Sequence, residues 1–303
     1  MKMKANNLAM NGWLNIFKEK GYISSHVVRE IKKKFNIKKI GHYGTLDPLA
    51  SGVLPLALGE ATKTIKFITY DRKEYSFFIN WGKETDTCDD EGKVIYETDK
   101  RPKIDEIVSI IKNYFTGNIT QIPPAFSALK INGKRAYELA RKNIKFEIGK
   151  KNIEIYKFIL IKTYSDHKAQ FFVSCGPGTY VRALARDLAK KLNTLGHASD
   201  IVRLKNSYFN ISDSINYERL IDISIVDLQN KLLPIDYVLK NIEEIKLEKK
   251  YSDMLKDGKV VFMNKHYNNI EKDSLFLIKN NSELVSIANL KKGYIIPRRN
   301  FNN

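Results

Sequence analysis

The sequence predicts an α+β fold built around a mostly antiparallel sheet, followed by a small β-rich domain. Amphipathic helical patterns and alternating strand patterns are mixed along the chain, without the regular strand–helix–strand spacing of a parallel sheet. From about residue 245 the pattern changes to short strand-like runs separated by Asn, Asp, Gly and Lys. With 303 residues, 43% of them hydrophobic, the chain is long enough for one or two domains with buried cores.

The first helix is expected at residues 24–35. Ser24 or Ser25 is expected to cap it, because a serine hydroxyl accepts a hydrogen bond from a free backbone N–H of the first helical turn. Apolar residues recur at helical spacing after this start. They predict one buried stripe, formed by Val27, Val28, Ile31 and Phe35.

Two further helices are expected in the middle of the chain. One covers residues 103–115, with Pro102 in its first turn, where a missing N–H costs no hydrogen bond. The other begins near Tyr180. The inward positions predicted for the two helices are Ile104, Ile107, Ile111 and Phe115, and then Val181, Leu184, Ala185, Leu188 and Leu192.

Strands are predicted between these helices. Residues 153–161 and 170–175 read as two of them. In a third strand, large apolar residues occupy every second position. This spacing places on one face of the strand the side chains of Tyr75, Phe77, Ile79 and Trp81.

The C-terminal part is expected to form its own small unit. A polar, charged joint at 241–250 separates a domain at 1–240 from a β-rich domain at 245–303. Short strand-like runs in the second domain lie at 260–263, 275–279 and 284–288.

Basic residues clearly outnumber acidic ones. Lys and Arg total 52 against 34 Asp and Glu, a formal net charge of +18, and 41 of the basic residues are lysine. A field of this sign attracts polyanions, of which nucleic acid is the usual one. The alternative is a solvated, lysine-rich surface that reflects an AT-rich genome. The charge therefore favours a nucleic-acid partner without distinguishing RNA from DNA, or an enzyme from a binder.

Several classes of protein are disfavoured. The longest apolar run, 53–58, is far shorter than the ~18 residues that a membrane-spanning helix needs. The basic N-terminus leads into no apolar segment, so no secretory signal is predicted. The two cysteines, Cys88 and Cys175, lie far apart, which fits a reducing cytosol and excludes a disulfide scaffold or a cysteine-based zinc site. We expect a soluble, cytoplasmic protein.

The most distinctive segment is residues 41–55, which holds three glycines and two prolines. These residues allow tight turns and the close approach of a ligand to the backbone. Asp47 precedes Pro48, whose ring pushes Asp47 into an extended conformation. With Leu46 and Leu49 beside it, the carboxylate would project into a partly apolar pocket. Taken alone, an Asp-Pro pair is more often an ordinary turn than a catalytic site.

This segment resembles the signature of the TruB-type tRNA pseudouridine synthases, also called tRNA pseudouridine 55 synthases. The resemblance covers essentially residues 12–235. The stretches that carry it are Gly41-His42-Tyr43-Gly44-Thr45-Leu46-Asp47-Pro48-Leu49-Ala50-Ser51-Gly52-Val53-Leu54, Leu58-Gly59-Glu60-Ala61-Thr62-Lys63, Lys73-Glu74-Tyr75, Thr85-Asp86-Thr87-Cys88-Asp89 with Gly92, Gln121-Ile122-Pro123-Pro124 with Ser127-Ala128-Leu129-Lys130, and Gly178-Thr179-Tyr180-Val181-Arg182.

Three stretches depart from the family pattern or match it weakly. The opening motif, usually Asp-Lys-Pro-x-Gly, is Phe17-Lys18-Glu19-Lys20-Gly21 here. Where the family has an apolar residue and two arginines, this chain has Ile201-Val202-Arg203, so one basic RNA contact is missing at Val202. The C-terminal residues resemble a PUA-like RNA-binding domain only through their strand rhythm and through Ile296-Pro297-Arg298-Arg299.

The resemblance implies a pseudouridine-synthase fold, a mostly antiparallel mixed sheet with flanking helices, and an isomerisation of uridine 55 in the T loop of tRNA without a cofactor. The base would be flipped into a pocket. Asp47 would be the essential carboxylate, as nucleophile or as base, and Arg182 would pair with it and keep it ionised. Tyr75 would stack on the base and relay a proton, and Tyr180 and Ile201 would complete the pocket wall. A core role is the alternative for Tyr75 and Ile201, and an exposed helix cation for Arg182.

The resemblance also implies contacts to the RNA. His42 would stack against the RNA and hold the base flipped. Lys130, Lys134 and Arg135 would contact phosphates from an RNA-gripping insertion at about 120–150, their alternative being solvated loop charges.

No metal site is predicted. No second His or Cys lies at ligand spacing from His42. A calcium loop would need a different spacing and a terminal Glu, so we expect only an acidic hairpin around Asp86, Asp89 and Asp90.

The main alternative function is a non-catalytic RNA-binding or RNA-chaperone protein with the same fold. The intact Asp47, Tyr75 and Arg182 argue against it, although a secondary role as a tRNA folding helper is compatible with catalysis. A guide-RNA-dependent relative would carry an extension before the first motif, and eleven residues precede Gly12 here. We therefore expect a stand-alone, monomeric enzyme that acts on the T arm of tRNA, with no guide RNA or obligate protein partner. A DNA-binding protein ranks third, because no recognition-helix pattern is present.

Overall fold

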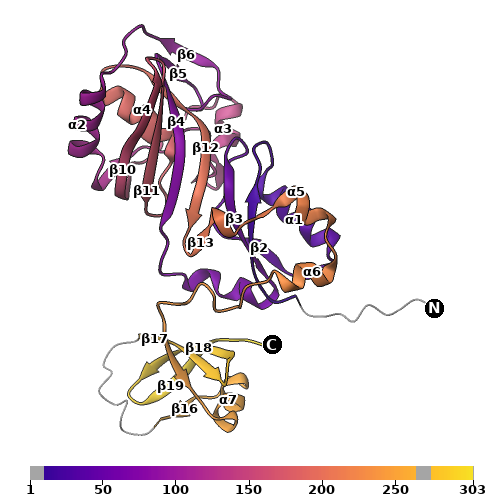
Figure 1. The fold of residues 1–303 in the computed structure, drawn as a ribbon. Helices are drawn as coiled ribbons and strands as arrows, with labels where there is room; N and C mark the ends of the chain where they lie inside the picture. Colours follow the sequence, from indigo (N-terminus) through magenta and orange to yellow (C-terminus); the bar gives the residue numbers. More distant parts are fainter. Residues whose placement is uncertain (1–9, 264–273, 303) are drawn as a thin grey trace.

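The computed structural model describes residues 10–263 and 274–302, which form two sheets with flanking helices (Figure 1). The larger sheet has ten strands and lies within residues 12–216, and the smaller has five strands and lies within residues 243–300. Neighbouring strands of the larger sheet are antiparallel, except that β1 pairs with β14 and β3 with β12 in parallel. The predicted α+β fold with a mostly antiparallel sheet is therefore confirmed.

The strands of the larger sheet run in the order β14-β1-β3-β12-β4-β11-β10-β7, with β13 beside β12 and β2 beside β3. Their bounds are β1 Gly12–Lys18, β2 Ile40–His42, β3 Ser51–Leu58, β4 Lys73–Trp81, β7 Gly117–Gln121, β10 Lys151–Ser165, β11 Lys168–Cys175, β12 Gly196–Asn206, β13 Phe209–Asn210 and β14 Ile215–Asn216. Two hairpins stand apart from it, β5 Lys83–Thr85 with β6 Val94–Glu97, and β8 Lys130–Ile131 with β9 Lys134–Arg135.

The alternation predicted for β4 is confirmed. Tyr75, Phe77, Ile79 and Trp81 are all buried, and they pack with α2 and α4 into one core. Phe77 packs with Phe158 of β10 and Phe171 of β11, whose ring centroids lie 6.0 and 5.8 Å from its own.

The described residues form seven α-helices, and the three that the sequence predicts lie close to their predicted positions. Their bounds are α1 Ser24–Lys34, α2 Ile104–Tyr114, α3 Ala136–Arg141, α4 Val181–Lys191, α5 Tyr217–Asp222, α6 Ile225–Asn230 and α7 Lys249–Lys256, with 3-10 turns η1 Gly59–Lys63, η2 Ile65–Phe67 and η3 Ile211–Asp213. In the three predicted helices, which are α1, α2 and α4, the inward stripes are buried or partly buried, with one exception. Ile104 is 55% exposed, because α2 turns Ile107, Ile110 and Ile111 toward the sheet instead.

Two predicted helix starts were wrong in detail. The N-cap of α1 is Ile23, and neither serine caps the helix, because the Ser24 hydroxyl bonds the backbone of Leu46 instead. Pro102 lies before the N-cap of α2, which is Lys103, rather than in its first turn.

The C-terminal sheet has the order β15-β17-β18-β19-β16. Its strands are β15 Glu243–Lys246, β16 Val261–Phe262, β17 Ser274–Asn280, β18 Glu283–Lys291 and β19 Tyr294–Asn300. The segment 241–250, predicted as a polar joint, contains β15 and the start of α7, because Ile245 is buried in the core of the second sheet. The predicted small β-rich domain is confirmed.

Candidate active site

The loop that carries Asp47 is held by two buried cations and one serine. Arg203 donates to the carbonyl oxygens of Gly44 and Thr45 at 2.9 and 3.2 Å, before Asp47. Lys18 Nζ donates to the carbonyl oxygens of Pro48 and Ala50 at 3.4 and 2.6 Å, after it. Since Lys18 and Arg203 are 0% and 1% exposed, these bonds form away from solvent, where they constrain the loop strongly.

Ser24 completes this frame from the start of α1. Its hydroxyl donates to the carbonyl oxygen of Leu46 at 2.7 Å and accepts from the N–H of Leu46 at 3.0 Å. Both backbone groups of the residue before Asp47 are therefore satisfied by one side chain. The loop is positioned before any ligand arrives, as a catalytic carboxylate requires.

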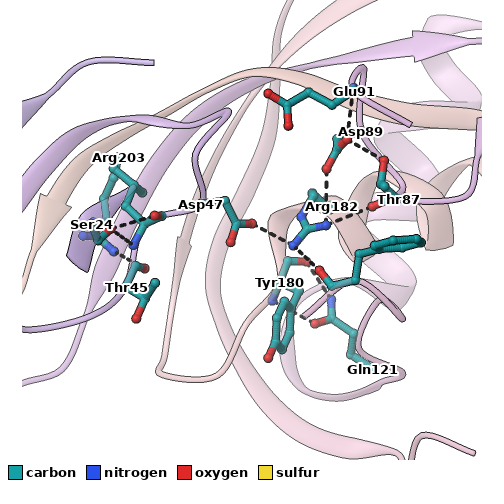
Figure 2. A network of polar contacts seen from close by, with 12 residues as sticks. Ser24, Thr45, Asp47, Thr87, Asp89, Glu91, Gln121, Tyr180, Arg182 and Arg203 are labelled. Atoms are coloured by element: carbon teal, nitrogen blue, oxygen red, sulfur yellow. Dashed lines mark hydrogen bonds and ion pairs between the residues drawn. The ribbon is translucent and has the colours of Figure 1, made fainter. Parts of the chain in front are cut away.

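The guanidinium of Arg182 joins two carboxylates. Its Nη2 lies 2.8 Å from Asp47 Oδ2, and its Nη1 lies 3.2 Å from Asp89 Oδ2 (Figure 2). The guanidinium also donates to the carbonyl oxygens of Thr87 and Phe126, each at 3.0 Å. The predicted pairing of Asp47 with Arg182 is confirmed, and Arg182 is a buried residue rather than an exposed helix cation.

Asp89 is enclosed by polar partners. The Thr87 hydroxyl donates to Asp89 Oδ1 at 2.5 Å, and the N–H of Glu91 donates to the same oxygen at 3.1 Å. Burial raises the pKa of the Asp89 carboxyl, against the opposing effect of the Thr87 hydrogen bond and the Arg182 charge. The expected acidic hairpin thus contributes one buried carboxylate to the site.

Two cavities meet at Asp47 and Arg182. One, of about 490 Å³, is lined by Tyr75, Tyr180 and Ile201. The other, of about 500 Å³, lies on the far side of the Asp47 loop and is lined by His42, Arg135 and Phe126 among others. The Asp47 side chain is 41% exposed, so the cavities give a ligand access to its carboxylate from either side.

Tyr75 is the aromatic wall of the first cavity. It is 8% exposed, and burial raises the pKa of its hydroxyl to about 12, although a hydrogen bond and the charge of Arg203 lower it. The phenol is therefore protonated at neutral pH. Tyr75 also packs in the core, so its two proposed settings, core and cavity wall, coexist. The same is true of Ile201, which is 4% exposed.

Tyr180 is positioned by Gln121. The Gln121 side chain accepts from the N–H of Tyr180 at 2.9 Å and donates to its carbonyl oxygen at 3.2 Å. This contact joins the end of β7 to the start of α4 and fixes the backbone two residues before Arg182. Sequence reasoning included Gln121 in a motif without assigning it this contact.

The predicted RNA contacts are distributed over both cavities. Lys130 lines the first cavity, and His42 and Arg135 line the second. Lys134 is exposed on β9 and lines neither. Burial lowers the pKa of His42, so its ring is neutral at physiological pH and offers a flat, uncharged face.

The described residues contain no group of three His, Cys, Asp or Glu side chains placed to hold a metal ion. None of the described helices is long and apolar enough to cross a membrane.

Comparison with known proteins decides the family. Residues 32–181 match the model of the TruB family pseudouridylate synthase N-terminal domain. The chain is 35% identical over 308 residues to the tRNA pseudouridine synthase B of Bartonella henselae, covering 96% of each protein. It is 38% identical over 290 residues to that of Clostridium tetani, covering 95% of this chain and 99% of the relative. The chain belongs to the TruB family of pseudouridylate synthases.

A solved structure supports the fold of this TruB-family chain. An H/ACA RNP bound to a substrate RNA containing 2′-deoxyuridine has a chain that matches 97% of this one, with a TM-score of 0.72. The match covers 86% of that chain at 20% identity, so the likeness is one of fold. The predicted pseudouridine-synthase fold is confirmed.

Several contacts of this TruB-family site escaped sequence reasoning. Arg203, Lys18 and Asp89 all lie in stretches compared with the family motifs, and the sequence predicts no contact for any of them. Each of these side chains makes its key bonds to residues at least 30 positions away. Their one signal in the sequence is their position inside a family motif. No local pattern around them predicts that they are buried.

Proposed function

We propose that this chain converts uridine 55 in the T loop of tRNA to pseudouridine, with Asp47 as the essential carboxylate. The observation that supports this most directly is the Asp47–Arg182 pair at the meeting point of two cavities, in a chain of the pseudouridylate synthase family. The relatives that match over nearly their whole length carry the name tRNA pseudouridine synthase B.

The reaction exchanges one glycosidic bond for another. The bond from the ribose to a ring nitrogen of uracil breaks, the base turns, and a bond to a ring carbon forms while that carbon loses its proton. Because no electrons or groups are gained or lost overall, side chains of the protein are sufficient. Asp47 acts either as a nucleophile at the sugar or as the base that begins an elimination.

The residues around Asp47 have distinct tasks in this proposal. Arg182 holds the carboxylate oriented toward the ribose and stabilises its charge. Tyr75 stacks on the flipped base, and its hydroxyl relays the proton lost from the ring carbon. Tyr180 and Ile201 close the sides of the cavity around the base.

The second cavity receives the RNA around the flipped nucleotide. His42 stacks there against the RNA, in the space that the base leaves. Lys130, Lys134 and Arg135 contact phosphates from an insertion at about 120–150. The C-terminal sheet is proposed as a PUA-like RNA-binding domain. The enzyme is proposed to act in the cytoplasm, where its tRNA substrate is found. It is proposed to act as a monomer without a guide RNA, since the T-arm stem-loop of the tRNA is bound by residues of this chain alone.

The test uses an unmodified tRNA transcript, with pseudouridine mapped by carbodiimide-dependent reverse-transcription stops. Wild-type protein is expected to give a single stop at the T-loop uridine, and Asp47→Asn to lower the rate by at least about 10³-fold, the scale of a lost nucleophile or base. Asp90→Asn, a change of an exposed hairpin carboxylate, is the matched control and should retain activity. If wild-type protein binds and refolds the tRNA yet gives no stop, the enzyme proposal is wrong and an RNA-chaperone role replaces it.

A further inference from the structure

A groove of about 560 Å³ lies beside β7, the last strand of the larger sheet. Its walls come from the end of α2, from β7 and from the C-terminal half of α4. Tyr114 and Ile122 line it and are 51% and 43% exposed. The groove therefore offers an aromatic ring and an aliphatic side chain to a ligand from solution.

Three lysines surround this apolar floor, namely Lys150, Lys190 and Lys191. Lys191 Nζ lies 4.4 Å from the centroid of the Tyr114 ring, so cation and ring form one surface. An exposed aromatic ring with an ammonium group over it matches a nucleotide, whose flat base can take the place of the ammonium on the ring while its negative phosphate pairs with the ammonium.

The acidic groups of the region do not cancel this charge. Asp187 lies 2.8 Å from Arg186 Nη2, and Glu84 lies 2.9 Å from Lys190 Nζ. Each carboxylate is thus matched by one cation. Lys150 and Lys191 remain, and they give the groove a net positive charge.

The groove adjoins the active site through the chain itself. Lys150 lines the groove, and the next residue, Lys151, lines the cavity at Asp47. On the neighbouring strand, Gln121 holds Tyr180 of the active site, and the next residue, Ile122, lines the groove. The chain therefore links the two cavities through consecutive residues at two places, Lys150 with Lys151 and Gln121 with Ile122.

We propose that this groove is a second RNA subsite, which holds an unpaired nucleotide adjoining the stem-loop that carries the target uridine. The base stacks on Tyr114 in place of the Lys191 ammonium, which turns from the ring to the phosphates and neutralises them together with Lys150. A duplex keeps its bases inside the stack and would use only the lysines, so an unpaired nucleotide is the occupant that uses both. The proposal rests on the proposed function, because RNA is then the polyanion at the neighbouring cavity.

The test compares a T-arm hairpin RNA with the same hairpin carrying a short single-stranded extension at its 5′ or its 3′ end. Dissociation constants are measured by fluorescence anisotropy at several salt concentrations. The groove variant combines Tyr114→Ala, Lys150→Ala and Lys191→Ala. The control variant combines Tyr96→Ala, Lys93→Ala and Lys231→Ala, which removes the same exposed residue types from positions that line none of the cavities described above.

One extension is expected to tighten binding to wild-type and control protein by about tenfold, the scale of one stacked base. The groove variant should lose this gain and bind the bare hairpin as wild type does. For the extended RNA, the slope of log affinity against log salt concentration should become shallower by about 1.4, the value for two lost phosphate contacts on a single strand. No gain with either extension, or a gain that the groove variant keeps, would overturn the proposal. Pseudouridine formation in the bare hairpin is measured in parallel: if wild-type protein forms none, the proposed function fails and this inference fails with it.

Discussion

The carboxylate of Asp47 lies in a setting dominated by buried cations. Arg182 touches it directly, while Arg203 and Lys18 hold the backbone of its loop. The charge of Asp47 acts back on Lys18, whose pKa it raises against the larger effect of burial. Asp89 supplies the balancing anion on the far side of Arg182. The site is thus a chain of alternating charges, and each member depends on the next for its orientation.

Asp89→Asn should show this dependence. The change keeps the shape of the side chain but removes the charge that holds Arg182 Nη1, so the guanidinium can turn away from Asp47. A charge-assisted hydrogen bond is worth about 1.5–3 kcal/mol, so we expect the single-turnover rate to fall roughly 10²-fold while RNA affinity stays unchanged. Asp90→Asn, in the same hairpin, is the control. A weakened affinity with an unchanged rate would contradict this role for Asp89.

Lys18 makes a prediction about pH. Burial lowers the pKa of its ammonium group to about 8, with Arg203 adding to the effect, whereas an unfolded lysine titrates near ~10.4. Between these values the unfolded chain binds more protons, so the Lys18 contribution to the free energy of unfolding rises with pH, by at most about 1.4 kcal/mol per unit, and is constant below pH 8.

The measurement is urea unfolding of wild-type protein and of Lys18→Met across pH 7 to ~10.5. The difference in unfolding free energy between the two should grow in favour of wild type above pH 8. Lys18→Arg, which stays protonated, serves as a second reference. Parallel pH profiles for all three proteins would show that Lys18 does not titrate in this range.

At this scale the sequence predicted the Asp47–Arg182 pair, and missed the residues that hold it in place. Asp47 and Arg182 stand in motifs that resemble a family signature, so both were recognised. Asp89 contacts Arg182 across 93 positions, and no local pattern marks it as buried. Ser24 was misread for a related reason, because a serine at a helix start usually caps, and only the tertiary structure brings Leu46 within reach of its hydroxyl.

At the scale of elements, the parallel pairing of β3 with β12 aligns the Asp47 loop with Arg203. Gly52 lies directly opposite Arg203 in this pairing, with a φ of +112°. A Cβ at Gly52 would lie 2.3 Å from the carbonyl oxygen of Arg203, a distance at which the two strands must separate. The glycine therefore sets how closely the strand that bears Arg203 approaches the loop it holds.

Gly52→Ala should accordingly destabilise the protein by roughly 2–4 kcal/mol, since both its backbone conformation and the strand spacing are lost. Activity should fall with it, because Arg203 would move away from the Gly44 and Thr45 carbonyl oxygens. Gly149→Ala is the control, as a Cβ there meets nothing within 4 Å. Thermal unfolding and single-turnover rates check both variants, and equal stability of the two would refute the close-approach argument.

The elements themselves were largely predictable, whereas their pairing was not. Periodicity alone places α1, α2, α4 and β4 within a residue or two of their observed bounds. It is silent on which strands pair, and the parallel contact of β3 with β12 joins segments about 150 positions apart. Local polarity also misled at 241–250, where β15 is charged on its outer face and buried only at Ile245.

At the scale of the whole molecule, the two sheets share a core. Trp13 and Ala61 of the first part pack in one cluster with Leu277, Ile287 and Phe301 of the second. Polar contacts reinforce it at the C-terminal end, where Lys63 Nζ donates to the carbonyl oxygen of Asn300 at 2.9 Å. The Glu60 carboxylate accepts from the N–H of Asn302 at the same distance. The C-terminal sheet is therefore packed against the first part of the chain rather than tethered by a linker.

Phe301→Ala tests whether this packing couples the two parts. Phe301 is fully buried, and Lys63 Nζ lies 5.7 Å from the centroid of its ring. Because the ring packs in the cluster that both parts share, its removal should lower the free energy of unfolding by about 3–5 kcal/mol. Phe276→Ala removes a ring of the same size from the core of the C-terminal sheet alone. By calorimetry, Phe301→Ala should separate the unfolding of the two parts into two transitions, whereas Phe276→Ala, which leaves the shared cluster intact, should lower the single transition without splitting it. A single transition shifted equally by both variants would mean that the shared cluster does not control the coupling.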